Sequence, residues 1–240
     1  MTTPVAQRPF VLSIPAAPVE RHGTVDLHLP THTDRAPAVV VVHGAPLPPD
    51  APDPRDWLLY RGYGTLLAAS GAVTALVSYQ VSDLSALPAA ADDIAAMVEQ
   101  VRADPRVDPE RVVLWFFSGG GLFAADWLRV PPAWLRGIAL TYPLLIPFPG
   151  WEVDARFLPV EALSSGTGVP LVLTRAGQDI PPVLAGIDAF VPAATAQGWP
   201  MRVIEVPDGQ HSFDILNHGP QSEAAVLAAR DAVLELLDAP

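Results

Sequence analysis

Three side chains in this sequence have the types and the chain order that nucleophilic catalysis requires: Ser118, Asp179 and His211. A serine hydroxyl is a weak nucleophile at neutral pH and needs a histidine to take its proton, and the histidine needs an acid to hold its tautomer. Such a serine attacks an acyl carbonyl, whose oxygen then requires hydrogen-bond donors. The three side chains can act together only if the surrounding elements bring them within hydrogen-bond distance.

Ser118 stands at an abrupt change in the sequence pattern. The apolar run 112–117 (VVLWFF) predicts a buried strand, and Ser118 is followed by Gly119, Gly120 and Gly121 and then by apolar residues at helical spacing. A serine in a tight strand-to-helix turn has a strained backbone and needs small neighbours. This turn would expose the hydroxyl and aim the N–H of Gly119 at a developing oxyanion. A glycine-rich turn without a catalytic role has the same local pattern.

The acid and the base candidates each follow a predicted strand. Asp179 comes shortly after the strand predicted at 171–174, where it could also cap the helix that follows. His211 comes shortly after the strand predicted at 203–206. His218 is its nearby rival, but it lies in an Asn-His-Gly-Pro turn, so His211 is better placed to act as the base.

The rest of the chain alternates between strand and helix patterns, as parallel α/β folds do. Short apolar runs predict buried strands at 39–42, 73–79, 112–117, 138–142, 171–174 and 203–206. Apolar spacing predicts helices around 59–67, 94–101 and 184–191, and a last helix through 226–237 with Ser222 as its N-cap. Right-handed crossovers then give a doubly wound, mostly parallel sheet of about eight strands with helices on both faces.

The N-terminal region has a different pattern. Val25, Leu27 and Leu29 alternate with Asp26 and His28, which is typical of a strand with one face in water. We expect it to pair in antiparallel fashion with a strand at 10–14.

Two proline-rich stretches interrupt the alternation, at 46–56 and at 143–168, the second of which would form a short cap-like segment. Each follows the carboxyl end of a predicted strand, which is where open α/β sheets bind ligands. We therefore expect these loops to help form a pocket. The candidate pocket residues are Leu47, Tyr79, Phe148, Trp151 and Phe213.

Composition narrows the function further. The 240 residues predict one domain spanning 1–240, with a mean hydropathy of +0.29. A net charge of −12 disfavours nucleic acid and anionic membranes as partners. The chain has no cysteine and all its basic residues are arginine, so thiolate metal sites, phosphate-loop lysines and lysine Schiff bases are excluded. No segment reads as a signal peptide or a membrane span, and we expect a cytoplasmic protein.

A metal-dependent hydrolase is the alternative that clustered histidines would support. His22, His28 and His32 lie near Asp26 and Asp34 in the sequence. Because Asp26 and His28 would share the wet face of one strand, a solvated surface is the preferred interpretation. We expect neither a metal nor an organic cofactor.

The order Ser118, Asp179, His211, together with the strand that ends in His43-Gly44, resembles the α/β-hydrolase superfamily, and within it the dienelactone-hydrolase-like or small carboxylesterase branch. The family turn reads G-x-S-x-G, whereas this chain has Phe116 two positions before the serine. The resemblance implies a serine carboxylester hydrolase with small ester substrates. It places the oxyanion donors at the N–H groups of Gly119 and Ala45, and gives His43 a structural role.

Three alternatives remain open within this resemblance. Dienelactone hydrolases proper use a cysteine, which this chain lacks, so a lactone hydrolase is less favoured. A peptidase of the prolyl-oligopeptidase type usually has an extra gating domain, for which this length has no room. A non-catalytic protein with the same fold, which binds a ligand or a partner, is favoured by Phe116 alone. The oligomeric state does not follow from the sequence.

Overall fold

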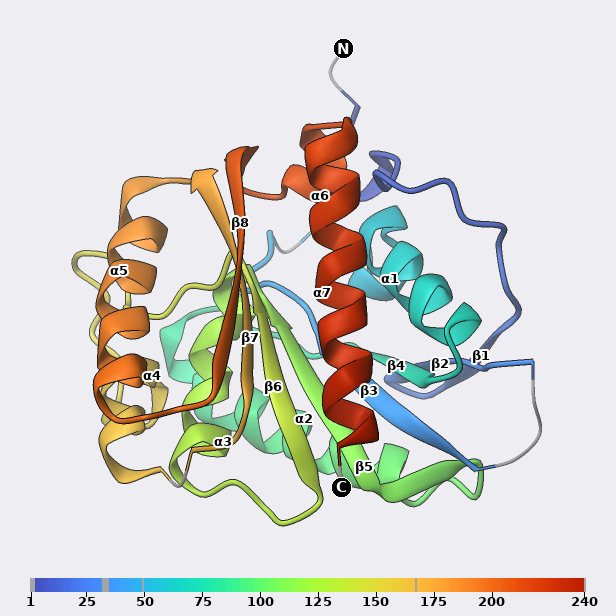
Figure 1. Ribbon diagram of the computed structural model, residues 1–240, viewed down its shortest axis with the longest axis horizontal. Helices are drawn as coiled ribbons and strands as arrows, with labels where there is room; N and C mark the ends of the chain where they lie inside the picture. The colour runs from blue at the N-terminus through green and yellow to red at the C-terminus, as the bar shows by residue number, and fades with distance from the viewer. Residues whose placement is uncertain (1–2, 32–34, 49, 167, 240) are drawn as a thin grey trace.

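The computed structural model describes residues 3–31, 35–48, 50–166 and 168–239. Eight strands form one sheet in the order β1-β2-β4-β3-β5-β6-β7-β8 (Figure 1). The strands are β1 Val19–His22, β2 Val25–His28, β3 Ala36–Val42, β4 Val73–Val77, β5 Val107–Phe117, β6 Leu135–Thr141, β7 Leu171–Gln178 and β8 Met201–Gln210. The pairs β1·β2 and β2·β4 are antiparallel, and every other neighbouring pair is parallel.

The α-helices are α1 Leu58–Ala69, α2 Leu87–Arg102, α3 Ala124–Arg129, α4 Pro159–Ala162, α5 Pro181–Ala196, α6 Phe213–Leu216 and α7 Pro220–Asp238. Short 3-10 helices are η1 Val5–Gln7, η2 Pro54–Asp56, η3 Leu84–Ala86, η4 Ser118–Phe123, η5 Ala155–Phe157 and η6 Leu163–Ser165. The longer helices correspond to the helical spacing in the sequence. The last helix begins at Pro220 with Gly219 as its N-cap, so the prediction of Ser222 as N-cap is wrong; Pro220 suits the first turn because its missing N–H would have no partner there.

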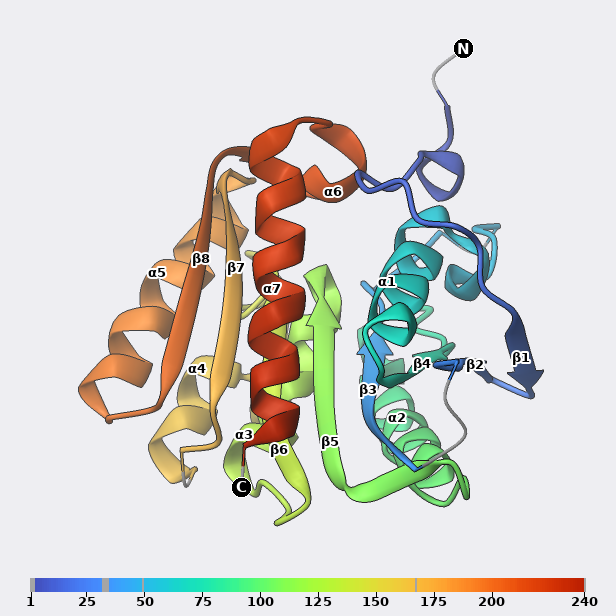
Figure 2. The same ribbon diagram turned by 45° about the vertical axis from the view of Figure 1, so that its right-hand side comes forward.

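The helices cover both faces of the sheet (Figure 2). Buried residues of α1 and α7 pack against one face, and those of α2, α3 and α5 pack against the other, which gives two separate apolar cores. The central strands are apolar on both faces for this reason. The predicted fold class, a doubly wound and mostly parallel α/β sheet, is confirmed.

The register of the sheet decides where the functional loops meet. Val42 of β3 pairs with Phe116 of β5, and Phe117 of β5 pairs with Thr141 of β6, so these strands end at one edge. Thr141 in turn pairs with Thr174 of β7. The loops that follow β3, β5, β6, β7 and β8 therefore converge at the carboxyl edge of the sheet, the usual ligand-binding edge of such folds.

The N-terminal region differs from its prediction. Residues 10–14 form no strand, because Phe10 packs on Tyr63 of α1 at a ring distance of 4.9 Å and Val11 donates its N–H to the carbonyl of Asp214. The antiparallel partners of β2 are β1 and β4 instead. The face of β2 predicted to be in water is also buried: Asp26 is 2% and His28 1% exposed. The segment that leads into β1, together with α1, covers this face.

The segment 143–168 is more structured than its proline content predicts. It contains η5, α4 and η6, and α4 packs beside α3. Phe148 and Trp151 contact each other at a ring distance of 4.8 Å and pack against the core on the α2 side of the sheet.

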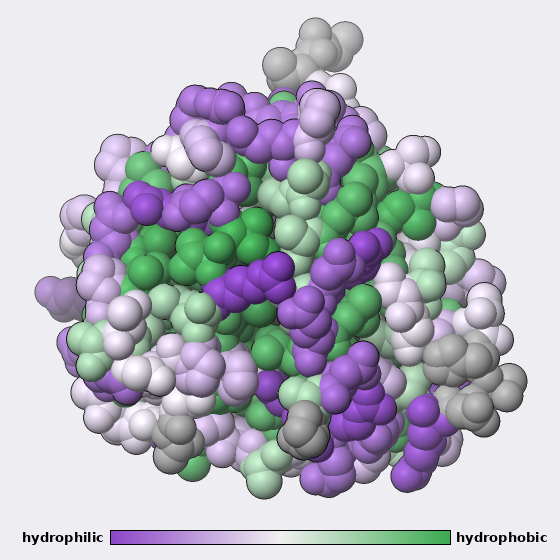
Figure 3. All heavy atoms as spheres, viewed as in Figure 1, coloured by the Kyte–Doolittle hydropathy of each residue, from purple (hydrophilic) through white to green (hydrophobic). Residues whose placement is uncertain are grey.

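Figure 3 shows the face of the molecule on which α7 lies, where hydrophobic and hydrophilic residues are mixed. This pattern agrees with α7, where Leu227, Leu234 and Leu236 are only partly buried between charged residues. No helix in the described part of the chain is long and apolar enough to cross a bilayer.

Candidate active site

Ser118, His211 and Asp179 lie in one chain of hydrogen bonds. The Oγ atom of Ser118 is 2.8 Å from Nε2 of His211. The other ring nitrogen, Nδ1, is 2.8 Å and 3.0 Å from the two carboxylate oxygens of Asp179. The Asp179 side chain is fully buried, whereas the His211 side chain is 27% exposed. The arrangement places a base next to the hydroxyl and a carboxylate behind the base, as proton transfer from a serine requires.

A strained turn presents the serine. Ser118 follows the last residue of β5 and begins η4, and its φ is +50°, which L-residues rarely adopt. A Cβ atom on Gly119 would overlap the carbonyl oxygen of Ala45, and one on Gly120 would overlap the carbonyl oxygen of His43. The loop after β3 therefore comes so close to the turn that only glycine fits at both positions.

Phe116 does not disturb this turn. Its side chain is fully buried in the core on the α2 side of the sheet, and its backbone stays in register with Val42 and Leu140. The hydrogen bond between Ser118 and His211 is intact beside it. An aromatic side chain buried in the core thus stands where the family turn has a small residue.

The loop after β3 carries Ala45, the second of the two expected oxyanion donors. The N–H of Gly44 donates to the hydroxyl of Tyr60 at 2.9 Å. Neither Ala45 nor Gly119 donates its N–H to another of the described residues. Both donors are therefore free, and the Ala45 and Gly119 backbones lie in contact next to Ser118.

His43 has a structural place. Its ring stacks on Tyr79 at 4.1 Å, and Nδ1 lies 2.7 Å from the carbonyl of Gly44. Burial lowers the pKa of His43 to about 4, so the imidazole is neutral at pH 7. The rival base His218 is exposed and contacts the carbonyl of Pro9, away from Ser118.

Asp179 is not the N-cap of α5, which was its alternative role. The N-cap of α5 is Ile180, with no side-chain cap. The Asp179 carboxylate instead accepts the N–H of Ile180 at 2.7 Å while it holds His211. The buried carboxylate is thereby fixed in place by the turn that leads into the helix.

Solved structures share this architecture. Thermogutta terrifontis esterase 2 phosphoramylated by tabun matches with a TM-score of 0.72 and 20% identity, over 94% of this chain and 96% of that chain. The same esterase in its propionate-bound form matches with a TM-score of 0.67 and 20% identity, over 92% of this chain and 95% of that chain. The chain has an α/β-hydrolase fold. DphMB1 matches with a TM-score of 0.69 and 20% identity, over 94% of this chain and 88% of that chain. Comparisons with family models and with curated sequences find no match.

The α/β-hydrolase fold encloses a small cavity beside Ser118. Its volume is about 120 Å³. Of the five predicted pocket residues, only Leu47 lines it; Tyr79 and Phe213 are buried in the cores, and Phe148 and Trp151 pack elsewhere. The lining that sequence reasoning missed is Val5, Pro46, Trp57, Leu59, Tyr60, Tyr142 and Ser212.

A buried carboxylate behind the His211 loop was also missed. Asp214 is 0% exposed and accepts hydrogen bonds from Tyr63 at 3.0 Å and from Tyr142 at 2.8 Å. Burial raises the pKa of Asp214 to about 6, although the two tyrosine hydroxyls oppose the shift. The Tyr142 ring lies 4.8 Å from the His211 ring. The sequence signal for this buried carboxylate is the single charged residue, Asp214, within the otherwise apolar segment Phe213–Leu216.

The metal-site alternative concerned His22, His28, His32, Asp26 and Asp34, of which His32 and Asp34 lie outside the described residues. Within the described ranges, no three His, Cys, Asp or Glu side chains converge on one point. Asp26 is held by Arg21 at 2.7 Å and by Arg55 at 3.1 Å.

Proposed function

We propose that this chain is a serine hydrolase that cleaves carboxylic esters of small soluble substrates through Ser118, His211 and Asp179. The observation that carries the proposal is the continuous hydrogen-bond chain from the Ser118 hydroxyl through His211 to the buried Asp179 carboxylate. The likeness to esterase structures supports it. The chemistry needs only side chains, backbone donors and water.

In the first half-reaction, Ser118 Oγ attacks the ester carbonyl while Nε2 of His211 takes the hydroxyl proton. Asp179 accepts the Nδ1–H bond and stabilises the imidazolium that forms. The carbonyl oxygen becomes negative and accepts the N–H groups of Gly119 and Ala45, a contribution of about 3 kcal/mol per donor in comparable sites. Nε2 then returns its proton to the leaving alkoxide, and the alcohol departs from an acyl-serine.

In the second half-reaction, water takes the place of the alcohol. His211 removes a proton from water as its oxygen attacks the acyl carbonyl, and the same backbone donors hold the oxyanion. Collapse of this intermediate breaks the bond to Ser118 Oγ, which recovers its proton from His211. The products are a carboxylic acid and the free enzyme.

The cavity favours a small group next to the reacting carbon. A volume of about 120 Å³ lined by Leu47, Trp57 and Leu59 suits a short aliphatic chain better than a long one. We assign the chain to the dienelactone-hydrolase-like or small carboxylesterase branch, an assignment that rests on the His43-Gly44 strand end and the triad order. Comparing hydrolysis of simple esters with that of lactones tests this finer assignment.

The decisive experiment compares hydrolysis of p-nitrophenyl acetate and butyrate by the wild type, Ser118→Ala and the control Ser164→Ala, whose side chain is exposed. We expect activity in the wild type and the control and none above background in Ser118→Ala. A fluorophosphonate probe should label the first two only. If all three proteins are folded, hydrolyse the esters equally slowly and are not labelled by the probe, the proposal fails. A non-catalytic binding protein with this fold then becomes the better interpretation.

A further inference from the structure

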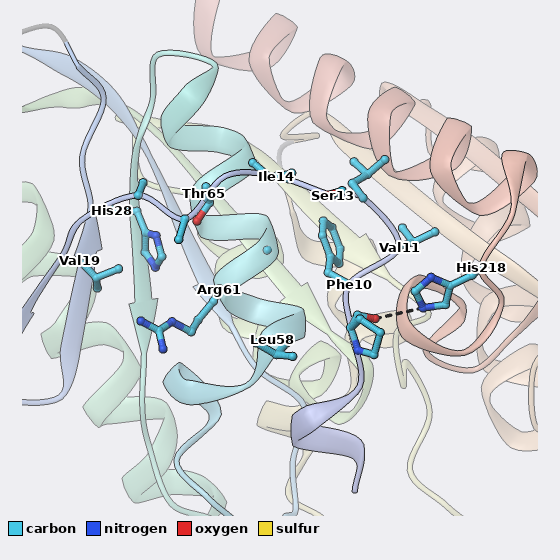
Figure 4. A pocket seen from close by; sticks show the side chains of 15 residues that line it. Phe10, Val11, Ser13, Ile14, Val19, His28, Leu58, Arg61, Thr65 and His218 are labelled. Carbon is cyan, nitrogen blue, oxygen red and sulfur yellow. Dashed lines mark hydrogen bonds between the residues drawn. The ribbon is translucent and has the colours of Figure 1, made fainter. Parts of the chain in front are cut away.

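A larger cavity lies between the N-terminal segment and α1 (Figure 4). Its volume is about 640 Å³, within the range of small-molecule sites, and it shares no lining residue with the cavity beside Ser118. In Figure 4, His28 and Arg61 stand at one end of this groove, while Phe10, Val11 and Leu58 stand towards the other. The groove is therefore polar at the His28 end, while at the other end apolar side chains lie beside His218, which contacts the carbonyl of Pro9.

His28 has no hydrogen-bond partner at the polar end. It is 1% exposed, and both ring nitrogens are buried without a partner among the described residues, a state that no other described histidine shares. Gly64 on α1 makes room for the ring, since a Cβ there would lie 2.6 Å from Nε2. Buried polar groups are nearly always hydrogen-bonded, so an orphaned imidazole in a cavity wall indicates a missing partner.

Arg61 lies beside this imidazole with an equally unused side chain. Among the fourteen basic residues, it is the arginine whose guanidinium makes neither a hydrogen bond nor an ion pair with any described residue. The carboxylate on the same face of β2, Asp26, is already occupied by Arg21 and Arg55. The positive charge of Arg61 thus faces the groove without an ion-pair partner, and it lies next to the imidazole N–H of His28, which has no acceptor among the described residues.

We propose that this groove binds a monocarboxylate with an aliphatic body. The carboxylate pairs with the Arg61 guanidinium and accepts the N–H of His28, and the aliphatic chain lies along Phe10, Val11 and Leu58. A monoanion matches the single unpaired arginine, and a carboxylate offers the two acceptors that the two donors require. This site is independent of ester hydrolysis at Ser118.

The chain above His28 can give way to such a ligand. Residues 12–18 form no helix or strand and make no backbone hydrogen bond to another described residue. Both ring nitrogens of His28 are buried beneath this part of the chain. In the proposed complex, a carboxylate that reaches the imidazole displaces part of this segment, which no backbone hydrogen bond to a described residue holds in place.

Ligand binding should be coupled to a proton. Burial first, and then the charge of Arg61, lower the pKa of His28 to about 4, while Asp26 opposes them. Arg61 and Asp26 are the charged groups that act on the ring, and residues 9–17 and β4 contain no charged residue. The neighbouring strand β1 carries Arg21, which pairs with Asp26, and Glu20, which pairs with His22 and Arg106. A bound carboxylate adds a negative charge next to the imidazole and favours its protonated form. Affinity for the carboxylate should consequently rise as pH falls from 7 towards 5.

The test is calorimetric titration of the full chain with hexanoate. Two matched ligands serve as controls: 1-hexanol, which lacks the charge, and acetate, which lacks the long aliphatic chain. We expect hexanoate to bind and Arg61→Gln to weaken it by about tenfold or more, the loss of one charge-assisted contact. Arg35→Gln is the control and should bind as the wild type does, because this exposed arginine hydrogen-bonds, among the described residues, to the carbonyl of Pro105 alone. Ser118→Ala should also bind normally.

Proton uptake is the second readout. Titrations at pH 6 in two buffers of different ionisation enthalpy should show protons taken up by the wild type, and none in His28→Gln. Equal binding of hexanoate and 1-hexanol, unchanged affinity in Arg61→Gln, or no hexanoate binding at millimolar concentration would each overturn the proposal. Because Arg61 is exposed, its variant folds, and the outcome does not depend on the buried His28.

Discussion

Asp214→Asn should change how the stability of this protein depends on pH. The Asp214 carboxylate is fully buried between Tyr63 and Tyr142, whose hydroxyls donate to it at 3.0 Å and 2.8 Å. Desolvation raises its pKa from 3.8 to about 6 in the folded chain, against the pull of the two hydrogen bonds. In the unfolded chain the carboxyl group is in water and has its ordinary pKa.

The sign follows from proton binding. Between pH 4 and 6 the folded state holds a proton on Asp214 that the unfolded state has released, so the free energy of unfolding falls as pH rises. A rise in pKa from 3.8 to about 6 corresponds to a total loss of about 3 kcal/mol, of which about 2 kcal/mol falls between pH 4.5 and 7.5. Asparagine cannot ionise, so the variant avoids this loss. The isosteric amide can still accept from the tyrosines through its oxygen.

The assay is urea-induced unfolding of the wild type and Asp214→Asn at pH 4.5, 6.0 and 7.5. We expect the stability of the variant relative to the wild type to rise by about 2 kcal/mol over this range. Taking the difference cancels the contributions of His28 and His43, whose pKa values of about 4 affect both proteins alike. Asp93→Asn, at an exposed position on α2, is the control.

A difference that stays constant with pH, within about 0.5 kcal/mol, would refute the reasoning, because it would mean that Asp214 ionises alike in the folded and unfolded chains. A difference that changes in the opposite direction would mean that the two tyrosine hydrogen bonds outweigh burial. A flat Asp93→Asn comparison beside either result would exclude a general effect of removing one negative charge.

Three further predictions concern the site. Asp179→Asn should lower ester turnover by about 10³-fold to 10⁴-fold with an unchanged circular dichroism spectrum, because the imidazole loses the acceptor that sets its tautomer; full activity would contradict the triad. Gly119→Ala should lower both activity and melting temperature because its Cβ would overlap the Ala45 carbonyl oxygen, whereas Gly219→Ala, in open space at the N-cap of α7, should leave activity unchanged and cost only the small stability of an N-cap glycine. Leu47→Ala should raise the ratio of hexanoate to acetate ester hydrolysis by enlarging the cavity, and an unchanged ratio would show that the acyl group lies elsewhere.

Much of this architecture is predictable because it is local in the sequence. The glycines after Ser118 and the apolar strand before it specify the turn, since only small residues tolerate such backbone approaches. The alternation of apolar strand runs with helical spacing specifies the doubly wound sheet. Once the strands are parallel, their carboxyl ends share one edge, so the loops carrying Asp179 and His211 meet the serine.

The misplaced elements depend on contacts between distant segments. The apolar run at Phe10 is suited to a strand, but packing on Tyr63 and the bond from Val11 to Asp214 hold it as an irregular segment over α1. The alternation in β2 indicates a wet face, yet that segment covers it and buries His28. Period-two patterning shows which residues share a face and not what covers that face.

The sequence by itself determined the strand-to-helix turn at Ser118, the alternation of strands and helices in the parallel core and the residue types available for proton transfer, because each depends on neighbours along the chain. Only the tertiary structure decided that Phe116 is buried in the core on the α2 side, which residues line the cavity with Leu47, and that Asp214 is enclosed by two tyrosines. In a strand buried on both faces, apolar residues look alike in sequence. Packing alone distinguishes their surroundings.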